Sequence, residues 1–211
     1  MSIFLAMLVA VVSCAFFYGL YRFYPTGGYF LRYYPRDLKD PKSWCNWFGN
    51  IPRHVDKHPE GFSFDLGGDK EAHYLTTPYG SLEGKTQLKI KGRVEGGPIL
   101  GRYGGASVMA MYFQRRWDDW TDSHQFYRWW SSSTVITPIV EGPFEMVFNL
   151  EPKGCISMEG KPAEDHVAEF EAAKKRAGMV GVTFGGIGDG YGHGAKSVNP
   201  AKVIIQSYEI I

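Results

Sequence analysis

The sequence has few cysteines, no surplus of charge and no recognisable catalytic motif. Three cysteines in 211 residues are too few for a disulfide scaffold. Basic and acidic residues balance, at 23 against 22, whereas nucleic-acid-binding proteins usually carry a clear basic surplus. Neither a GxSxG nor an HExxH motif occurs. We therefore expect a protein that is not an enzyme, needs no cofactor and has no nucleic-acid partner.

One long apolar run opens the chain. Residues 3–24 read IFLAMLVAVVSCAFFYGLYRFY, without a charge before Arg22. The uncharged part is long enough for a helix to cross a bilayer, and aromatic residues crowd its end, as in an interfacial belt. We predict a single transmembrane helix over 1–24. Its membrane residues are Phe4, Leu8, Val12, Phe16 and Tyr21.

The apolar run has two other interpretations. A cleaved signal peptide normally has a basic start, and no Lys or Arg precedes the run. VVSC, which ends at Cys14, is similar to a lipoprotein cleavage site, but the apolar run continues past it. Basic residues follow the span from Arg22 onward, so the positive-inside rule favours a cytoplasmic domain. A lumenal domain with a disulfide between Cys45 and Cys155 stays open as the alternative.

The segment 25–60 is rich in proline and has little regular periodicity. It predicts a juxtamembrane linker that Trp44 and Trp47 dock against a partner. His54 and His58 have a spacing that could chelate a metal on a helix, but the neighbouring prolines favour an irregular solvated segment. We expect no metal here.

From Gly61 onward the pattern is that of β-strands. Residues 86–96, TQLKIKGRVEG, alternate apolar and charged side chains, which predicts a half-buried strand. Residues 106–116, ASVMAMYFQRR, are apolar on both faces, which is typical of a central strand. The other expected strands are GFSFDLGG, AHYLTTPYG, HQFYRWWSS, FEMVFNL, MVGVTFGG and AKVIIQSYEII. The chain is thus expected to be all-β, an antiparallel β-sandwich over 61–211.

One helix interrupts the strands, at about 162–177. Pro162 suits a first helical turn, acidic residues follow it, and basic residues precede Gly178, which suits a C-terminal cap. We expect a surface helix packed over one end of the sandwich.

The closing strands MVGVTFGG and AKVIIQSYEII, joined by the glycine-rich GGIGDGYGHG, resemble the last hairpin of a jelly-roll β-sandwich. Such domains include carbohydrate-binding modules and galactose-binding-like domains, among them the complex I intermediate-associated type. The chain also resembles uncharacterised bacterial membrane-anchored proteins that carry YFQRR, YRWW and GYGHG. The resemblance implies a jelly-roll fold without an assigned activity. GGIGDGYGHG is not a dinucleotide site, because a strand follows it instead of a helix.

Residues 113–132, FQRRWDDWTDSHQFYRWWSS, combine aromatic rings with charges of both signs. We expect two antiparallel strands joined by WDDWTD, with ion pairs between its aspartates and the two preceding arginines. The rings could fill the core, grip a partner protein, or stack on a sugar. The expected binding surface consists of Arg115, Trp117, Asp119, Trp120, Tyr127 and Trp129, with Trp44 and Trp47. DLGGDKE, residues 65–71, is a weak candidate for a structural calcium site.

Two functions follow from these patterns. In the first, the chain is a non-catalytic accessory or assembly subunit of a larger membrane complex, such as a respiratory or photosynthetic one. Its partners are then the lipid bilayer and other subunits, which the small residues of the span would let approach closely. The alternative is a membrane-anchored carbohydrate-binding module with a glycan as partner.

Overall fold

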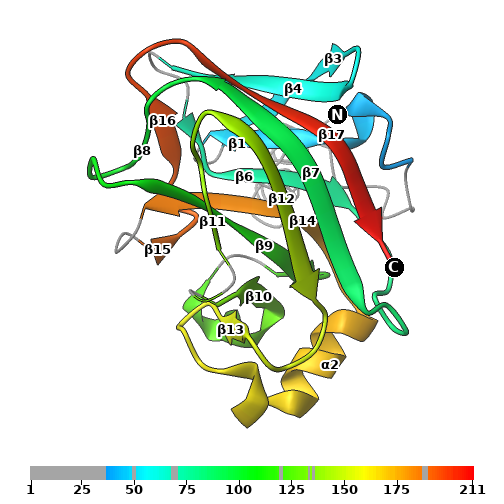
Figure 1. Ribbon diagram of the computed structural model, residues 1–211. Helices are drawn as coiled ribbons and strands as arrows, with labels where there is room; N and C mark the ends of the chain where they lie inside the picture. The colour runs from blue at the N-terminus through cyan, green and yellow to red at the C-terminus, as the bar shows by residue number, and fades with distance from the viewer. Residues whose placement is uncertain are drawn as a thin grey trace, which may run out of the picture. The chain divides into compact units, whose positions relative to one another are not determined.

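The computed structural model describes residues 37–48, 51–67, 71–118, 121–132, 134, 136–186 and 190–211. Within them the chain forms an antiparallel β-sandwich with one α-helix at its end (Figure 1). The expected span 1–24, with Phe4, Leu8, Val12, Phe16 and Tyr21, lies outside the described residues, and so do Asp119 and Trp120. Within the described part, the structure contains no helix with the length and hydrophobicity of a membrane span.

The larger sheet, sheet A, has the strand order β13-β10-β9-β14-β6-β1-β2. Two short strands join it from the side, β11 on β9 and β15 on β14. Its strands are β1 (Cys45–Phe48), β2 (Ile51–His54), β6 (Tyr74–Pro78), β9 (Ser107–Arg115), β10 (Arg128–Ser131), β11 (Thr137–Pro138), β13 (Cys155–Ser157), β14 (Ala177–Gly186) and β15 (Gly190–Tyr191).

The second layer, sheet B, has the order β12-β7-β17-β4-β3, and a small sheet has the order β5-β16-β8. Sheet B lies in front of sheet A in Figure 1. The strands of these two sheets are β3 (Asp56–His58), β4 (Gly61–Leu66), β5 (Glu71–Ala72), β7 (Gln87–Gly96), β8 (Ile99–Gly101), β12 (Gly142–Asn149), β16 (Ala195–Ser197) and β17 (Ala201–Ile210).

The core lies between the two main sheets and is built by alternation. Strand β7 points Leu88, Ile90 and Val94 inward, and its charged residues point outward, as the sequence pattern predicts. Aromatic rings join the layers: Phe64 of β4 lies 5.7 Å from Phe184 of β14, measured between ring centroids. The antiparallel β-sandwich expected from the sequence is therefore confirmed.

The helical segment is shorter than expected. It consists of a 3-10 turn, η3 (Ala163–Asp165), and the helix α2 (Val167–Lys175), because His166 between them has a non-helical backbone. Helix α2 closes one end of the sandwich (Figure 1) and buries Phe170. It ends before Gly178, which belongs to β14 instead of capping the helix.

The expected linker contributes to both sheets. From Asp37 on, its described residues form a 3-10 turn, η1 (Pro41–Ser43), then β1 and β2 of sheet A and β3 of sheet B. Trp44 stacks in the core on Phe62, with ring centroids 5.1 Å apart. The β domain therefore begins well before Gly61, because its N-terminal strands complete the edges of the two sheets.

Two further expectations about strands are corrected. Residues 123–127 belong to a 3-10 helix, η2 (Asp122–Tyr127), so that the strand after the aspartate-rich connection is only β10. The closing strands do not form a hairpin, because β14 lies in sheet A and β17 in sheet B.

The two cysteines of the domain are free and buried. Cys45 lies on β1 and Cys155 on β13, five strand steps apart in sheet A, or about 24 Å at normal strand spacing. A disulfide needs Cα atoms within about 7 Å, so the two thiols cannot pair within one chain.

Trp129 provides a test of the core. The residue has no exposed surface, and its ring lies 5.3 Å from the ring of Phe170. We expect Trp129→Ala to lower the free energy of unfolding by about 3–5 kcal/mol, since the cavity cannot refill. Urea titration of the intact chain measures this. Tyr103→Ala, at a mostly exposed position, should change it by less than about 0.5 kcal/mol, and equal effects of the two substitutions would contradict the assignment.

Candidate functional site

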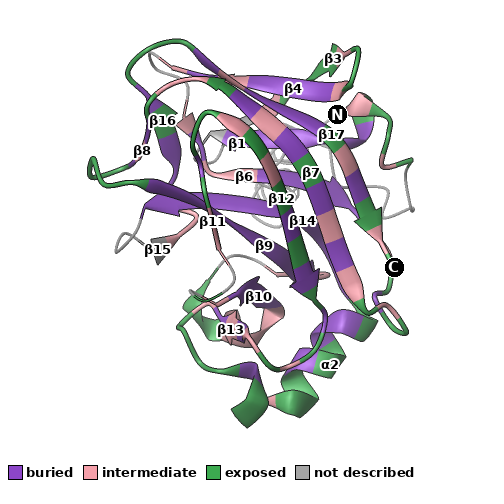
Figure 2. Ribbon diagram, viewed as in Figure 1, coloured by how far each residue is buried: buried purple, intermediate pink, exposed green. Residues whose placement is uncertain are grey.

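The face of sheet A that points away from sheet B is unusual because it is buried as well. In β9, Met109, Met111 and Phe113 point into the core, whereas Tyr112 and Gln114 point to the opposite side of the sheet. All of β9 except Arg115 is nevertheless buried (Figure 2). We call this second side the outer face. Its members include Trp47, Tyr74, Thr76, Tyr112, Gln114, Arg128, Trp130 and Thr183, of which Tyr74 is half-buried and the others are buried.

Strand register brings these side chains into rows across the sheet. Trp130 of β10 is the register partner of Tyr112 on β9, and Arg128 is the partner of Gln114. The row that begins at Trp130 and Tyr112 continues through Gly181 of β14 to Thr76 of β6. Residues that are directly opposite each other in antiparallel strands have neighbouring side chains. The outer face therefore carries a compact group of one indole, one phenol, one amide and one guanidinium.

Aromatic contacts extend this group in both directions. The rings of Tyr74 and Tyr112 meet edge to face, with centroids 5.2 Å apart. On the other side, the ring of Trp130 lies 6.2 Å from the ring of Tyr191. Trp47 is fixed by its indole N–H, which donates to Thr76 Oγ1 over 3.0 Å. The face is thus lined by rings whose positions are set by neighbouring side chains.

The charge on the outer face is compensated locally. Arg128 Nε lies 2.6 Å from Asp118 Oδ2, and both side chains are almost fully removed from water. Arg128 Nη2 also donates to the carbonyl of Thr121 over 3.4 Å. A buried ion pair is costly to break from one side, so this contact ties the connection after β9 to strand β10.

Three polar atoms of this group are buried and form no hydrogen bond with the described residues: the Tyr112 hydroxyl, Gln114 Oε1 and Trp130 Nε1. Leaving such an atom without a partner costs about 1–3 kcal/mol. The three atoms differ in character, because the indole N–H only donates, the amide oxygen only accepts, and the hydroxyl does both. The outer face therefore presents a mixed set of hydrogen-bonding groups beside flat rings.

Two segments rim the outer face. The connection between β9 and β10 contributes Asp118, and the turn after β15 lies against Tyr74. A Cβ at Gly192 would collide with the Tyr74 hydroxyl, so only glycine allows this close approach. The ring of His73 fixes the turn through a 2.8 Å contact between Nδ1 and the carbonyl oxygen of Gly192.

The residues expected to form the binding surface are divided between core, rim and edge. Trp44 and Trp129 lie in the core, which excludes a surface role for them. Trp47 lies on the outer face but is buried, and Trp117 is exposed at the rim. Arg115 places its guanidinium 4.2 Å from the centroid of the Tyr127 ring, so these two residues pair with each other beside β10.

Apart from Trp47, the residues that make the outer face were not expected from the sequence, although it contains a signal for them. Between its terminal residues Ser107 and Arg115, β9 is apolar on both sides except for Tyr112 and Gln114. Arg128 and Trp130 share a face by simple alternation. What the sequence does not reveal is that β10 pairs with β9 in the register that joins these four residues.

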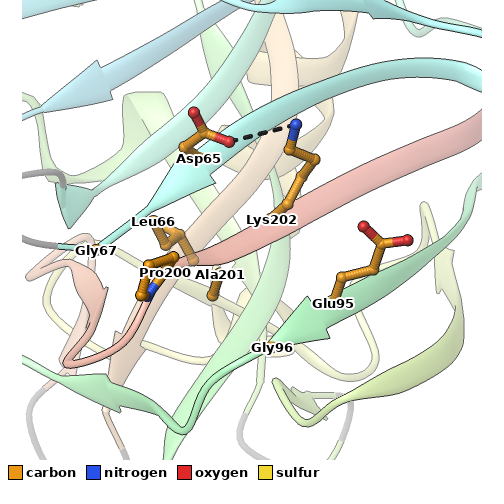
Figure 3. Close-up of a pocket in the computed structure, with 8 residues that line it drawn as sticks. All are labelled: Asp65, Leu66, Gly67, Glu95, Gly96, Pro200, Ala201 and Lys202. Carbon is orange, nitrogen blue, oxygen red and sulfur yellow. Dashed lines mark ion pairs between the residues drawn. The ribbon is translucent and has the colours of Figure 1, made fainter.

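A second hollow offers less chemistry. An open cleft of about 540 Å³ lies at the ends of β4, β7 and β17, and Figure 3 shows the residues that line it. Lys202 Nζ lies 3.6 Å from Asp65 Oδ1, and Glu95 pairs with Arg93. The charged side chains that line the cleft are therefore already paired. The described residues that line the cleft include no aromatic one. The lining residues are Asp65, Leu66, Gly67, Glu95, Gly96, Pro200, Ala201 and Lys202.

Residues 68–70 of the calcium candidate 65–71 lie outside the described residues, and its described residues do not assemble a set of ligands. Asp65 pairs with Lys202, and Glu71 Oε2 lies 3.6 Å from His73 Nε2. Asp65 and Glu71 both line a small hollow of about 90 Å³ beside Asn46. In the part of the chain that the structure describes, no group of three acidic, histidine or cysteine side chains could hold a metal ion.

Comparison with known proteins gives little further guidance. No protein-family model matches the chain, and no curated protein matches it. Among solved structures, the chain is similar to one described as "xylan-binding module CBM15", at a TM-score of 0.42 and 10% sequence identity. The match covers 82% of this chain and 95% of the other. Similarity at this level assigns neither a fold family nor a ligand.

Two tyrosines of the outer face, Tyr74 and Tyr112, predict how stability depends on pH. Burial raises the pKa of Tyr74 to about 12 and that of Tyr112 well above its ordinary value of about 10. The unfolded chain therefore loses these protons before the folded protein does. Their contribution to stability is complete below about pH 10 and is lost as the pH rises from there through about 12.

We expect Tyr74→Phe to make this alkaline loss of stability smaller, because one raised pKa is removed. Urea unfolding of the intact chain at several pH values between about 9 and 12 measures it. Tyr103→Phe is the matched control, since the Tyr103 side chain is mostly exposed. If the Tyr74→Phe variant loses stability with pH as steeply as the parent, the burial assigned to Tyr74 is contradicted.

Proposed function

We propose that this chain is a non-catalytic binding protein that holds a neutral saccharide on the outer face of sheet A. One observation carries the proposal: three buried polar atoms without partners in the described residues lie beside flat aromatic rings on one face. A buried polar group in a native protein calls for a partner, and here the three groups call for one that both donates and accepts. A sugar hydroxyl does both.

The shape of a pyranose ring also matches the outer face. A pyranose ring has a flat face of C–H groups, which stacks on an aromatic ring, and an edge of hydroxyl groups, which needs planar polar partners. Trp130 and Tyr112 supply rings, and Gln114 and Arg128 lie one row further along the same strands. Apolar contact and hydrogen bonding would thus be available to one ligand at the same time.

Charge favours a neutral ligand over an acidic one. The guanidinium of Arg128 is already matched by Asp118, so it is not a spare cation for a uronic or sialic acid. The hydroxyls of Tyr74 and Tyr112 are uncharged at neutral pH, since a tyrosine has an ordinary pKa of about 10 and burial raises it further in both. A carboxylate placed here would lose its hydration without gaining an opposite charge.

The burial of the face has a kinetic consequence. Side chains that are already fixed lose little entropy on binding, which favours affinity. A ligand can reach them only when a rim segment moves, so association should be slower than the usual 10⁵–10⁷ M⁻¹s⁻¹, as a rough expectation. We further propose that the strands have jelly-roll connectivity, that residues 1–24 form a membrane anchor, and that the β domain lies on the cytoplasmic side.

An accessory subunit of a membrane complex is the second candidate. The same three buried polar atoms can be met by backbone groups of a partner protein, and the apolar run 3–24 could place that partner in the membrane. Purification of the intact chain in a mild detergent distinguishes the two. Stoichiometric co-migrating subunits support this candidate, and a lone chain that binds a glycan supports the first.

Gln114→Met tests the saccharide proposal. The substitution keeps the shape of the side chain and removes the buried amide, so we expect the melting temperature to stay equal or rise. Binding should weaken about tenfold or more, because the ligand loses a buried hydrogen bond. The intact chain is first screened on an array of neutral oligosaccharides, and the affinity of each hit is then measured by isothermal titration calorimetry.

Gln87→Met provides the matched control. Gln87 lies on β7 of sheet B, where its Nε2 donates to Asn149 Oδ1, away from the outer face. This variant should bind like the parent. The proposal fails if the parent binds no oligosaccharide on the array, or if the Gln114 and Gln87 variants bind equally well.

A further inference from the structure

Trp117 has a backbone conformation that its residue type disfavours. Its φ is +68°, and it is the one non-glycine residue with a positive φ in the described part of the chain. Side chains of L-residues crowd the backbone in this region, which is normally left to glycine and, less often, to asparagine or aspartate. A tryptophan at such a position requires a reason.

Both neighbours of Trp117 are held in place, and this forces the conformation between them. The amide of Arg116 donates to the carbonyl of Arg176 over 2.9 Å, and Arg116 Nε donates to the carbonyl of Ala177 over 3.3 Å. On the other side, Asp118 turns its side chain inward to Arg128. The chain therefore reverses at Trp117, and the indole is left 68% exposed.

The residue that follows Trp117 in the chain reaches the outer face. Asp118 contacts Arg128, which is the register partner of Gln114 in the candidate site. The Cα atoms of Trp117 and Asp118 are only about 3.8 Å apart, because they are consecutive. A strained backbone that displays a large ring at the rim of a site is the arrangement in which strain is retained for function.

We propose that Trp117 is a second stacking platform, which makes the site selective for an oligosaccharide over a single sugar. The inference rests on the proposed function and deepens it. One unit of the ligand occupies the outer face at Tyr112 and Trp130, and a following unit extends past the Arg128–Asp118 pair onto the indole of Trp117. The ligand is then a neutral, unbranched chain whose rings present flat faces, such as a chain of equatorially linked pyranoses.

Two variants of Trp117 separate binding from stability. Trp117→Gly removes the ring and relieves the strained φ, so the melting temperature should be unchanged or higher by roughly 2–4 °C. Affinity for a longer chain should nevertheless fall about tenfold, as it does when a central aromatic contact is truncated. Trp117→Ala should lose the same affinity without the gain in melting temperature. The matched control is Tyr103→Ala, because Tyr103 is 73% exposed but follows β8.

The probes are cello-oligosaccharides and xylo-oligosaccharides of one to six units, titrated into the intact chain in mild detergent. The inference predicts that affinity of the parent rises with chain length, and that the Trp117 variants lose this rise while they bind single sugars like the parent. An equal loss at every length, or no loss at any length, overturns the inference and leaves the proposed function standing. If the parent binds none of the oligosaccharides, here or on the array of neutral glycans, both are overturned.

Discussion

Strand β9 has both of its faces buried, and much of the domain is arranged around this constraint. On one side Met109, Met111 and Phe113 pack into the core against sheet B and α2. On the other side Tyr112 and Gln114 are just as far from water, but they bring polar atoms with them. A sheet of a sandwich normally has one dry face and one wet face. Sheet A departs from this rule. The strands next to β9 and beyond, β10, β14 and β6, also have buried side chains on the outer face.

The proposed function sets binding against stability. Buried atoms without hydrogen bonds weaken the free protein, whereas a replacement by apolar groups of similar shape would strengthen it. Under the proposed function, the same atoms bond to an incoming partner without first losing water. Proteins accept such costs mainly where a function depends on them. The ion pair between Arg128 and Asp118 fits this view, since it holds one polar side chain of the face at a fixed place.

Much of the fold could be predicted from periodicity alone, and the candidate site could not. The alternation of Leu88, Ile90 and Val94 correctly predicts a half-buried strand, and the largely apolar β9 correctly predicts a central one. The prolines of 25–60 hid β1, β2 and β3, because proline is tolerated at sheet edges. The aromatic stretch 113–132 drew attention to Trp129, but only strand register shows that Trp130 and Arg128 are the residues on the outer face. Register depends on long-range pairing, which composition and local pattern do not contain.

The separation of Cys45 and Cys155 within sheet A has a consequence for where this domain can work. Burial raises the pKa of each thiol to about 12, so both remain protonated and unreactive at neutral pH. Neither thiol holds the fold together, and neither is available to a passing oxidant. The domain can therefore keep one structure in a reducing cytosol and in an oxidising lumen, and a change of compartment during evolution would leave its architecture intact.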